Sequence, residues 1–134
     1  MTSEEEHRKN VKELLEDINE KIRSNLIVER QKLIGFSTSE ISCNLLALLL
    51  HKKNLISPGF NVNHRFFVSE KTAKERFDFD FPQKKKLLDL LVEQEKCRTL
   101  LCYGREKEKK LVEKSIENMN KIKEIVQEII GEDL

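Results

Sequence analysis

Apolar side chains recur at three- and four-residue steps along most of this chain, which is the spacing of amphipathic helices. The first stripe follows Ser3, which together with Glu6 three residues later fits a capping box. Its members are Val11, Leu14, Leu15, Ile18, Ile22 and Leu26. The pattern predicts a helix that reaches about residue 32, and Gly35 is expected to break it.

A second start signal, Ser37 followed by Glu40, precedes the stretch ISCNLLALLLHKKN. Apolar residues cover most of the helix circumference here, which predicts a central, well-buried helix rather than a surface one. Lys52 and Lys53 fall in its last turn, where cations interact favourably with the helix dipole.

The segment from residue 54 to 82 is the least regular part of the chain. Pro58 and Gly59 indicate a turn, Ser69 is expected to cap a short helix, and Pro82 fits the first turn of the next helix, near Asp80. Six of the seven phenylalanines lie here, five of them at positions 66, 67, 77, 79 and 81. They either fasten a long connection onto the rest of the fold by burying aromatic area or form a partner-binding surface.

Two further helices are predicted after this segment. The first runs from Pro82 to about Cys102, and its stripe becomes polar in the last two turns, with Gln94, Glu95 and Arg98. The second runs from about Glu106 to Ile130, with Gly131 as its C-terminal cap. No segment alternates with period two. The sequence therefore predicts one all-α domain, residues 1–134, an up-and-down bundle of four long helices plus a short helix in the long central connection.

Charge and composition limit the functional classes. The 134 residues include 25 Lys and Arg against 24 Asp and Glu, so binding of nucleic acid through bulk charge is not indicated. Any RNA contact would be local, and DNA binding is not expected. The N-terminus is polar and acidic, and the longest apolar run, LLALLL, is far short of a bilayer span. We expect a soluble, cytoplasmic protein that contacts no membrane.

Cysteine and histidine positions do not suggest a metal centre. The three cysteines, Cys43, Cys97 and Cys102, contain no C-x-x-C pair and are expected to be buried thiols. The three histidines, His7, His51 and His64, lack the spacing of metal ligands. We predict no metal and no cofactor.

The stretch EKCRTLLCYGREK is the candidate site. Arg98 borders an apolar stripe, so its guanidinium must reach solvent, pair with a carboxylate such as Glu95, or face a cleft. One interpretation is structural: an arginine at a helix C-terminus with Tyr103 under the turn, where Gly104 ends the helix. The other is a ligand groove containing both Arg98 and Tyr103, in which Gln94 or Glu95 orients the guanidinium.

The residues RTLLCYG, Arg98 to Gly104, resemble the motif of the HEPN family of small helical bundles. That motif has an Arg, a polar residue, here Thr99, and a His four to six positions after the Arg, often followed by Gly. The stretch SEISCNLLALLLHKKNLISPG is similar to the family's second helix, and the order and lengths of the predicted helices agree over about residues 3 to 130.

The resemblance implies a homodimer whose two motifs face each other across a cleft. Many members are metal-independent endoribonucleases, and several are toxins neutralised by a small nucleotidyltransferase, as in toxin–antitoxin pairs. Others bind nucleotides or are non-catalytic modules. In the nucleases the residue matching Arg98 would hold the scissile phosphate.

This chain departs from the motif because Tyr103 stands in place of the His, and Arg105 in place of a later family Tyr. An unperturbed phenol has a pKa of about 10, so it is a poor proton-transfer group at neutral pH. The resemblance therefore favours an RNA- or nucleotide-binding, or partner-binding, protein without efficient ribonuclease activity.

Three alternatives stay open at this point. In the first, the motif region forms a cleft for a phosphate-bearing ligand, with the candidate ligand-binding residues Glu95, Arg98, Thr99, Tyr103, Gly104 and Arg105. In the second, the bundle is a dimerisation or interaction module with a purely structural motif. In the third, the protein is a toxin-type endoribonuclease. Nearby Lys107, Lys109 and Lys110 favour phosphate, whereas Glu106 and Glu108 weaken that field.

Overall fold

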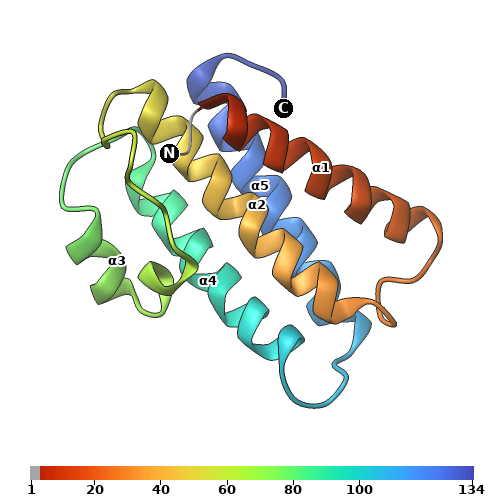
Figure 1. Ribbon diagram of the computed structural model, residues 1–134. Helices are drawn as coiled ribbons and strands as arrows, with labels where there is room; N and C mark the ends of the chain where they lie inside the picture. Colours follow the sequence, from red (N-terminus) through yellow and green to blue (C-terminus); the bar gives the residue numbers. More distant parts are fainter. Residues whose placement is uncertain (1–3) are drawn as a thin grey trace.

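The computed structural model describes residues 4–134, and over that range every regular element is a helix, with no strand (Figure 1). The helices are α1 (Glu4–Arg23), α2 (Gln31–Lys52), the 3-10 turn η1 (His64–Phe67), α3 (Glu70–Arg76), α4 (Lys84–Cys102) and α5 (Lys109–Ile130). The predicted all-α bundle with four long helices and a short one is therefore confirmed. The expected capping box at Ser3 involves a residue outside the described range.

The long helices run up and down around α2. His7, near the start of α1, lies 2.8 Å from the amide oxygen of Asn44, well along α2. Gly35, near the start of α2, meets Leu101, at the end of α4. Since α2 packs against α1, α4 and α5, almost its whole circumference is buried, as its continuous apolar pattern predicts (Figure 1).

The boundary between the first two long helices differs from the prediction. Helix α1 ends at Arg23, followed by a turn in which Asn25 adopts a left-handed conformation (φ 55°), and α2 already begins at Gln31. Gly35 and Ser37 therefore lie inside α2 and are buried. Gly35 does not break a helix; it lets two helices approach, because a Cβ there would stand 2.7 Å from the Cβ of Leu101.

The other helix ends agree with the sequence signals more closely. Ser69 caps α3, as predicted, and its hydroxyl accepts a hydrogen bond from the amide of Thr72. Helix α4 begins at Lys84, two residues after Pro82, because Gln83 takes a left-handed conformation (φ 58°). Gly131 closes α5 with φ 70°, and its N–H donates to the carbonyl of Gln127.

The phenylalanine-rich connection is fastened to the bundle by its own rings. Phe77 is fully buried and stacks on Phe67 with ring centroids 5.7 Å apart. The rings of Phe60, Phe66 and Phe79 pack around Phe77. Helix α3 and turn η1 rest on α4, so this aromatic cluster holds the connection against the bundle, as one of the two interpretations predicts.

Helix α2 is long and apolar enough, by length and composition, to cross a membrane. Most of that apolar stretch is buried against the neighbouring helices, which accounts for its composition within the bundle.

Candidate functional site

A buried amide lies where α2, α4 and α5 meet. The Nε2 group of Gln94 donates to the carbonyl oxygen of Ser115 at 2.9 Å, to the hydroxyl of Ser42 at 3.2 Å and to the carbonyl oxygen of Thr38 at 3.3 Å. An amide with these partners is structural, because it is buried and joins three helices. The expectation that Gln94 orients the guanidinium of Arg98 is therefore wrong.

Arg98 extends from α4 onto α2 instead. Its Nη1 donates to the hydroxyl of Ser39 at 3.1 Å and to a carboxylate oxygen of Glu40 at 3.2 Å. The guanidinium carbon lies 5.1 Å from the centre of the Phe36 ring, a cation–π distance. Only 14% of the side chain is exposed. Helical spacing predicted Glu95 as the ion-pair partner of Arg98. In the structure Arg98 pairs with Glu40 instead, and Glu95 has a different partner.

That partner is His64 from η1. The imidazole Nδ1 lies 2.8 and 3.0 Å from the two carboxylate oxygens of Glu95, which is buried. Glu95 and Arg98 are three residues apart on α4 and therefore share a face. The structure thus brings an imidazole to the carboxylate that precedes Arg98 by one turn of α4. The sequence carried no signal for this contact, because His64 belongs to the irregular connection 31 positions before Glu95.

Tyr103 lies apart from this cluster. It follows the last residue of α4 with an extended backbone (φ −128°, ψ 151°), and 72% of it is exposed. Within residues 4–134 the side-chain partners of Arg98 all belong to α2, and Tyr103 is not among them. Thr99 and Arg105 are also exposed. Gly104 has a positive φ of 81°, a backbone conformation that glycine adopts readily and that is expected of a glycine at the end of a helix.

Among the basic residues after the motif, Lys107 holds the loop in place. The ammonium of Lys107 donates to the carbonyl oxygens of Arg105, at 2.5 Å, and Tyr103, at 3.5 Å. The backbone N–H of Lys107 donates to the side-chain oxygen of Gln31 at 2.7 Å, which ties the loop to the start of α2. A hollow of about 540 Å³ beside this loop mixes both charges. Its lining residues are Glu106, Lys107, Glu108, Lys110, Leu111 and Lys114.

Two carboxylates and one guanidinium determine the charge of the α2–α4 face. Glu40 pairs with Arg98, and Glu95 contacts His64. All three charged side chains, Glu40, Glu95 and Arg98, affect the pKa of the buried Cys43 thiol. Burial raises this pKa most, the two carboxylates raise it further, and Arg98 lowers it. A phosphate at Nη1 of Arg98 would have to displace the carboxylate of Glu40.

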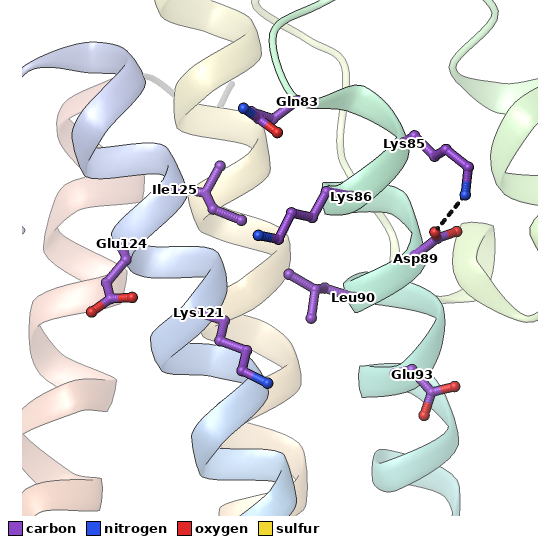
Figure 2. Close-up of a pocket in the computed structure, with 9 residues that line it drawn as sticks. All are labelled: Gln83, Lys85, Lys86, Asp89, Leu90, Glu93, Lys121, Glu124 and Ile125. Carbon is purple, nitrogen blue, oxygen red and sulfur yellow. Dashed lines mark hydrogen bonds and ion pairs between the residues drawn. The ribbon is translucent and has the colours of Figure 1, made fainter.

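A larger hollow, of about 740 Å³, lies between α4 and α5 (Figure 2). Figure 2 shows Leu90 and Ile125 on its floor, with Lys86 reaching over them from α4. Lys85 pairs with Asp89 at 3.1 Å on its outer side. Over residues 4–134 no group of three or more His, Cys, Asp or Glu side chains is arranged to hold a metal ion.

Comparison of the chain with protein-family models, with curated proteins and with solved structures gives no match. The resemblance to the HEPN family therefore depends on the residues from Arg98 to Gly104 and on the order of the helices. The class that the fold itself defines is an all-α helical bundle.

Proposed function

We propose that this protein is a cytoplasmic, HEPN-like interaction module that forms a homodimer and has no efficient ribonuclease activity. One observation carries the proposal: the guanidinium of Arg98 is engaged inside its own chain, where Nη1 donates to Ser39 and Glu40. A residue that clamps a scissile phosphate needs free donors directed at the ligand. Arg98 is mostly buried and ion-paired, so its role in this proposal is to join α4 to α2.

The surface beside this pair suits a second copy of the chain. Leu33 and Phe36, three residues apart on α2, are 54% and 44% exposed. Large apolar side chains on a helix face next to an opposite-charge pair, Glu40 and Arg98, form a self-complementary patch. In a twofold arrangement each copy would offer the same patch to the other. A stable interface of this kind should bury at least roughly 1,000 Å² in total.

The dimer is tested by light scattering at micromolar concentration. We expect a dimer mass for the wild type and a monomer mass for Phe36→Asp. Val68→Asp is the matched control, because Val68 is also an exposed aliphatic residue, at 58%, but lies beside η1 and α3. A wild-type monomer would contradict the proposed dimer.

The role of Arg98 is tested by Arg98→Ala. Loss of a mostly buried, hydrogen-bonded arginine leaves Glu40 without its partner and should lower the melting temperature. We expect no binding of single-stranded RNA or of nucleotides by the wild type. The opposite result, unchanged stability with RNA binding lost on substitution, would overturn the interaction-module proposal.

The second candidate is a nucleotide- or RNA-binding site, and the His64–Glu95 pair favours it. That pair brings a histidine, the residue type that the motif lacks at Tyr103, to the carboxylate one turn before Arg98 on α4. Under this candidate, ligand phosphate would take the place of Glu40, Glu40→Gln would strengthen binding, and Tyr103→His would raise any cleavage. If neither the wild type nor these variants bind or cleave RNA, this candidate is excluded, together with the toxin-type nuclease and its nucleotidyltransferase partner.

A further inference from the structure

Helix α1 packs on α2, and its first turns are also tied to the C-terminal segment by the ion pair between Arg8 and Glu132. In a closed bundle of four up-and-down helices, each helix packs on two neighbours. Here α2 contacts α1, α4 and α5, whereas no Cα of α1 lies within 8 Å of a Cα of α5 in the part of the chain that the structure describes. In Figure 1, α2 crosses in front of α5 and α1 lies to one side of both. The side of the bundle between α1 and α5 is therefore packed less closely than the others, and it is open where two hollows reach the surface.

One of these hollows lies at the end of α1. The hollow has a volume of about 480 Å³ and its floor consists of three isoleucines, Ile22, Ile27 and Ile116. Ile22 belongs to the apolar stripe of α1, yet 43% of it is exposed. An aliphatic residue on the core-facing stripe of an amphipathic helix is normally covered by other apolar side chains. The exposure of Ile22 therefore leaves an apolar surface in the groove to which another apolar side chain could bind.

The rim of the same hollow is acidic. Glu113, Glu117 and Glu124 project from α5, against one ammonium, Lys121. Lys121 pairs with Glu117 at 3.0 Å, which leaves Glu113 and Glu124 without an ion-pair partner among residues 4–134. Glu124 lies on α5 between the two hollows and lines both this groove and the hollow drawn in Figure 2. A ligand in the groove would meet two unneutralised carboxylates above an apolar floor.

We propose that the α1–α5 groove binds an amphipathic helix of another protein. The apolar ridge of that helix would contact Ile22, Ile27 and Ile116, and its Lys or Arg side chains would face Glu113 and Glu124. Docking of an amphipathic helix into an apolar groove is a common recognition mode, and opposite charges on the rim speed association and fix the register.

A second copy of this chain is a poorer occupant of the groove. The exposed apolar patch that the chain itself offers, Leu33 and Phe36, lies beside both Glu40 and Arg98 and is not predominantly basic. Contact between that patch and this groove would also be head-to-tail, and it would extend into open chains instead of closing a dimer. The groove and the proposed dimer surface lie on different helix faces, so either can fail without the other.

The test uses two fluorescent model peptides of about 18 residues, or five helical turns, with leucines at helical spacing. One carries lysines on its polar face and the other carries glutamates. Fluorescence anisotropy with the full chain should show saturable binding of the lysine peptide at micromolar concentration, at least tenfold tighter than the glutamate peptide. Rising salt should weaken this binding, because the rim charges are exposed.

Two kinds of variant localise the binding to the groove. Ile22→Asp should abolish it, and the double variant Glu113→Lys/Glu124→Lys should weaken it about tenfold and favour the glutamate peptide. Glu75→Lys, an exposed carboxylate on α3, is the matched control and should leave it unchanged. Circular dichroism checks that each variant is folded; if Ile22→Asp is not, the double variant, which changes only exposed residues, decides the question.

Three results would overturn the proposal: no saturable binding of the lysine peptide, equal affinity for both peptides, or the same weakening by Glu75→Lys as by the double variant. Self-association of the wild type that Ile22→Asp abolishes would also overturn it, because the groove would then hold a second copy.

Discussion

Gly35 on α2 lies so close to Leu101 on α4 that a Cβ atom added to the glycine would stand 2.7 Å from the Cβ of Leu101, closer than two such carbons can remain. The two helices therefore approach each other closely at this point. One turn further along α2, Ser39 and Glu40 come within hydrogen-bond distance of Arg98. The absence of a side chain at position 35 thus allows the arrangement of the candidate site.

Replacing Gly35 by Ala should destabilise the fold even though alanine is the better helix former. The added methyl group would force α2 and α4 apart, and overpacking of this kind costs about 1–3 kcal/mol. Thermal and urea denaturation measure the effect. Gly59→Ala is the control, because a Cβ there meets nothing within 4 Å. Equal stability of the two variants would contradict the close approach.

Acidification should destabilise the protein through His51, whose ring stacks on that of His7. Their rings stack with centroids 5.3 Å apart, and the Nε2 atoms of both are buried without a hydrogen-bond partner. Burial and the neighbouring His7 lower the pKa of His51, while Glu4 opposes them weakly. The unfolded chain, whose histidines titrate at about pH 6.5, then binds more protons than the folded one.

The stabilisation from the neutral His51 is therefore complete above about pH 6.5 and is lost as the pH falls below that value. Urea unfolding at pH 7.5, 6.5 and 5.5, steps chosen to bracket a pKa of about 6.5, should show a decreasing free energy of unfolding. His51→Phe keeps a ring in the stack but cannot titrate, so its pH dependence should be weaker. A variant with the same slope as the wild type would show that His51 is not responsible.

The C-terminal segment should loosen at low pH through Glu132. Its carboxylate accepts two hydrogen bonds from Arg8, at 2.6 and 2.9 Å, and one from Lys52 at 2.8 Å. The hydrogen bonds from Arg8 and then Lys52 lower the pKa of Glu132 from 4.5 to about 2. Because the folded pKa is depressed, the stabilisation is present above pH 4.5 and is lost as the pH falls toward 2.

Glu132→Gln should remove that acid-dependent part of the stability and lower the melting temperature at pH 7. Glu128→Gln, an exposed residue of α5, is the matched control and should change neither. If the acid-unfolding curves of both variants follow the wild type, the contact of Glu132 with Arg8 and Lys52 contributes nothing to folding.

All three cysteines should react slowly with thiol reagents in the native protein. Burial raises the pKa of Cys43, Cys97 and Cys102, so the reactive thiolate is scarce. Cys102 is the least buried and should react first. Mass spectrometry after timed exposure to a thiol reagent, with Cys102→Ser for comparison, measures the order. Native labelling as fast as that of the urea-unfolded chain would contradict the burial.

The sequence predicted helix type and number well because periodic apolar spacing is a local property. The stripe with Val11 and Ile18 and the apolar run of α2 became buried faces, and Ser69 and Gly131 became caps. The predicted break between the first two long helices was misplaced because Gly35 and Ser37 are residue types that often end or begin a helix. In the structure Gly35 lies inside α2, where it packs against Leu101, a residue 66 positions away along the chain.

The sequence by itself determined that this chain forms an all-α bundle with a buried central helix, since each amphipathic stripe has to cover an apolar face. Only the tertiary structure decided the partners of the charged residues. Arg98 pairs with Glu40 and Glu95 with His64 because the rotation of α4 against α2 and the path of the phenylalanine-rich connection bring them together. Spacing within one helix favoured a pair between Glu95 and Arg98, and it could not anticipate competing partners from other elements. The same holds for the less closely packed side between α1 and α5, which depends on how whole helices pack.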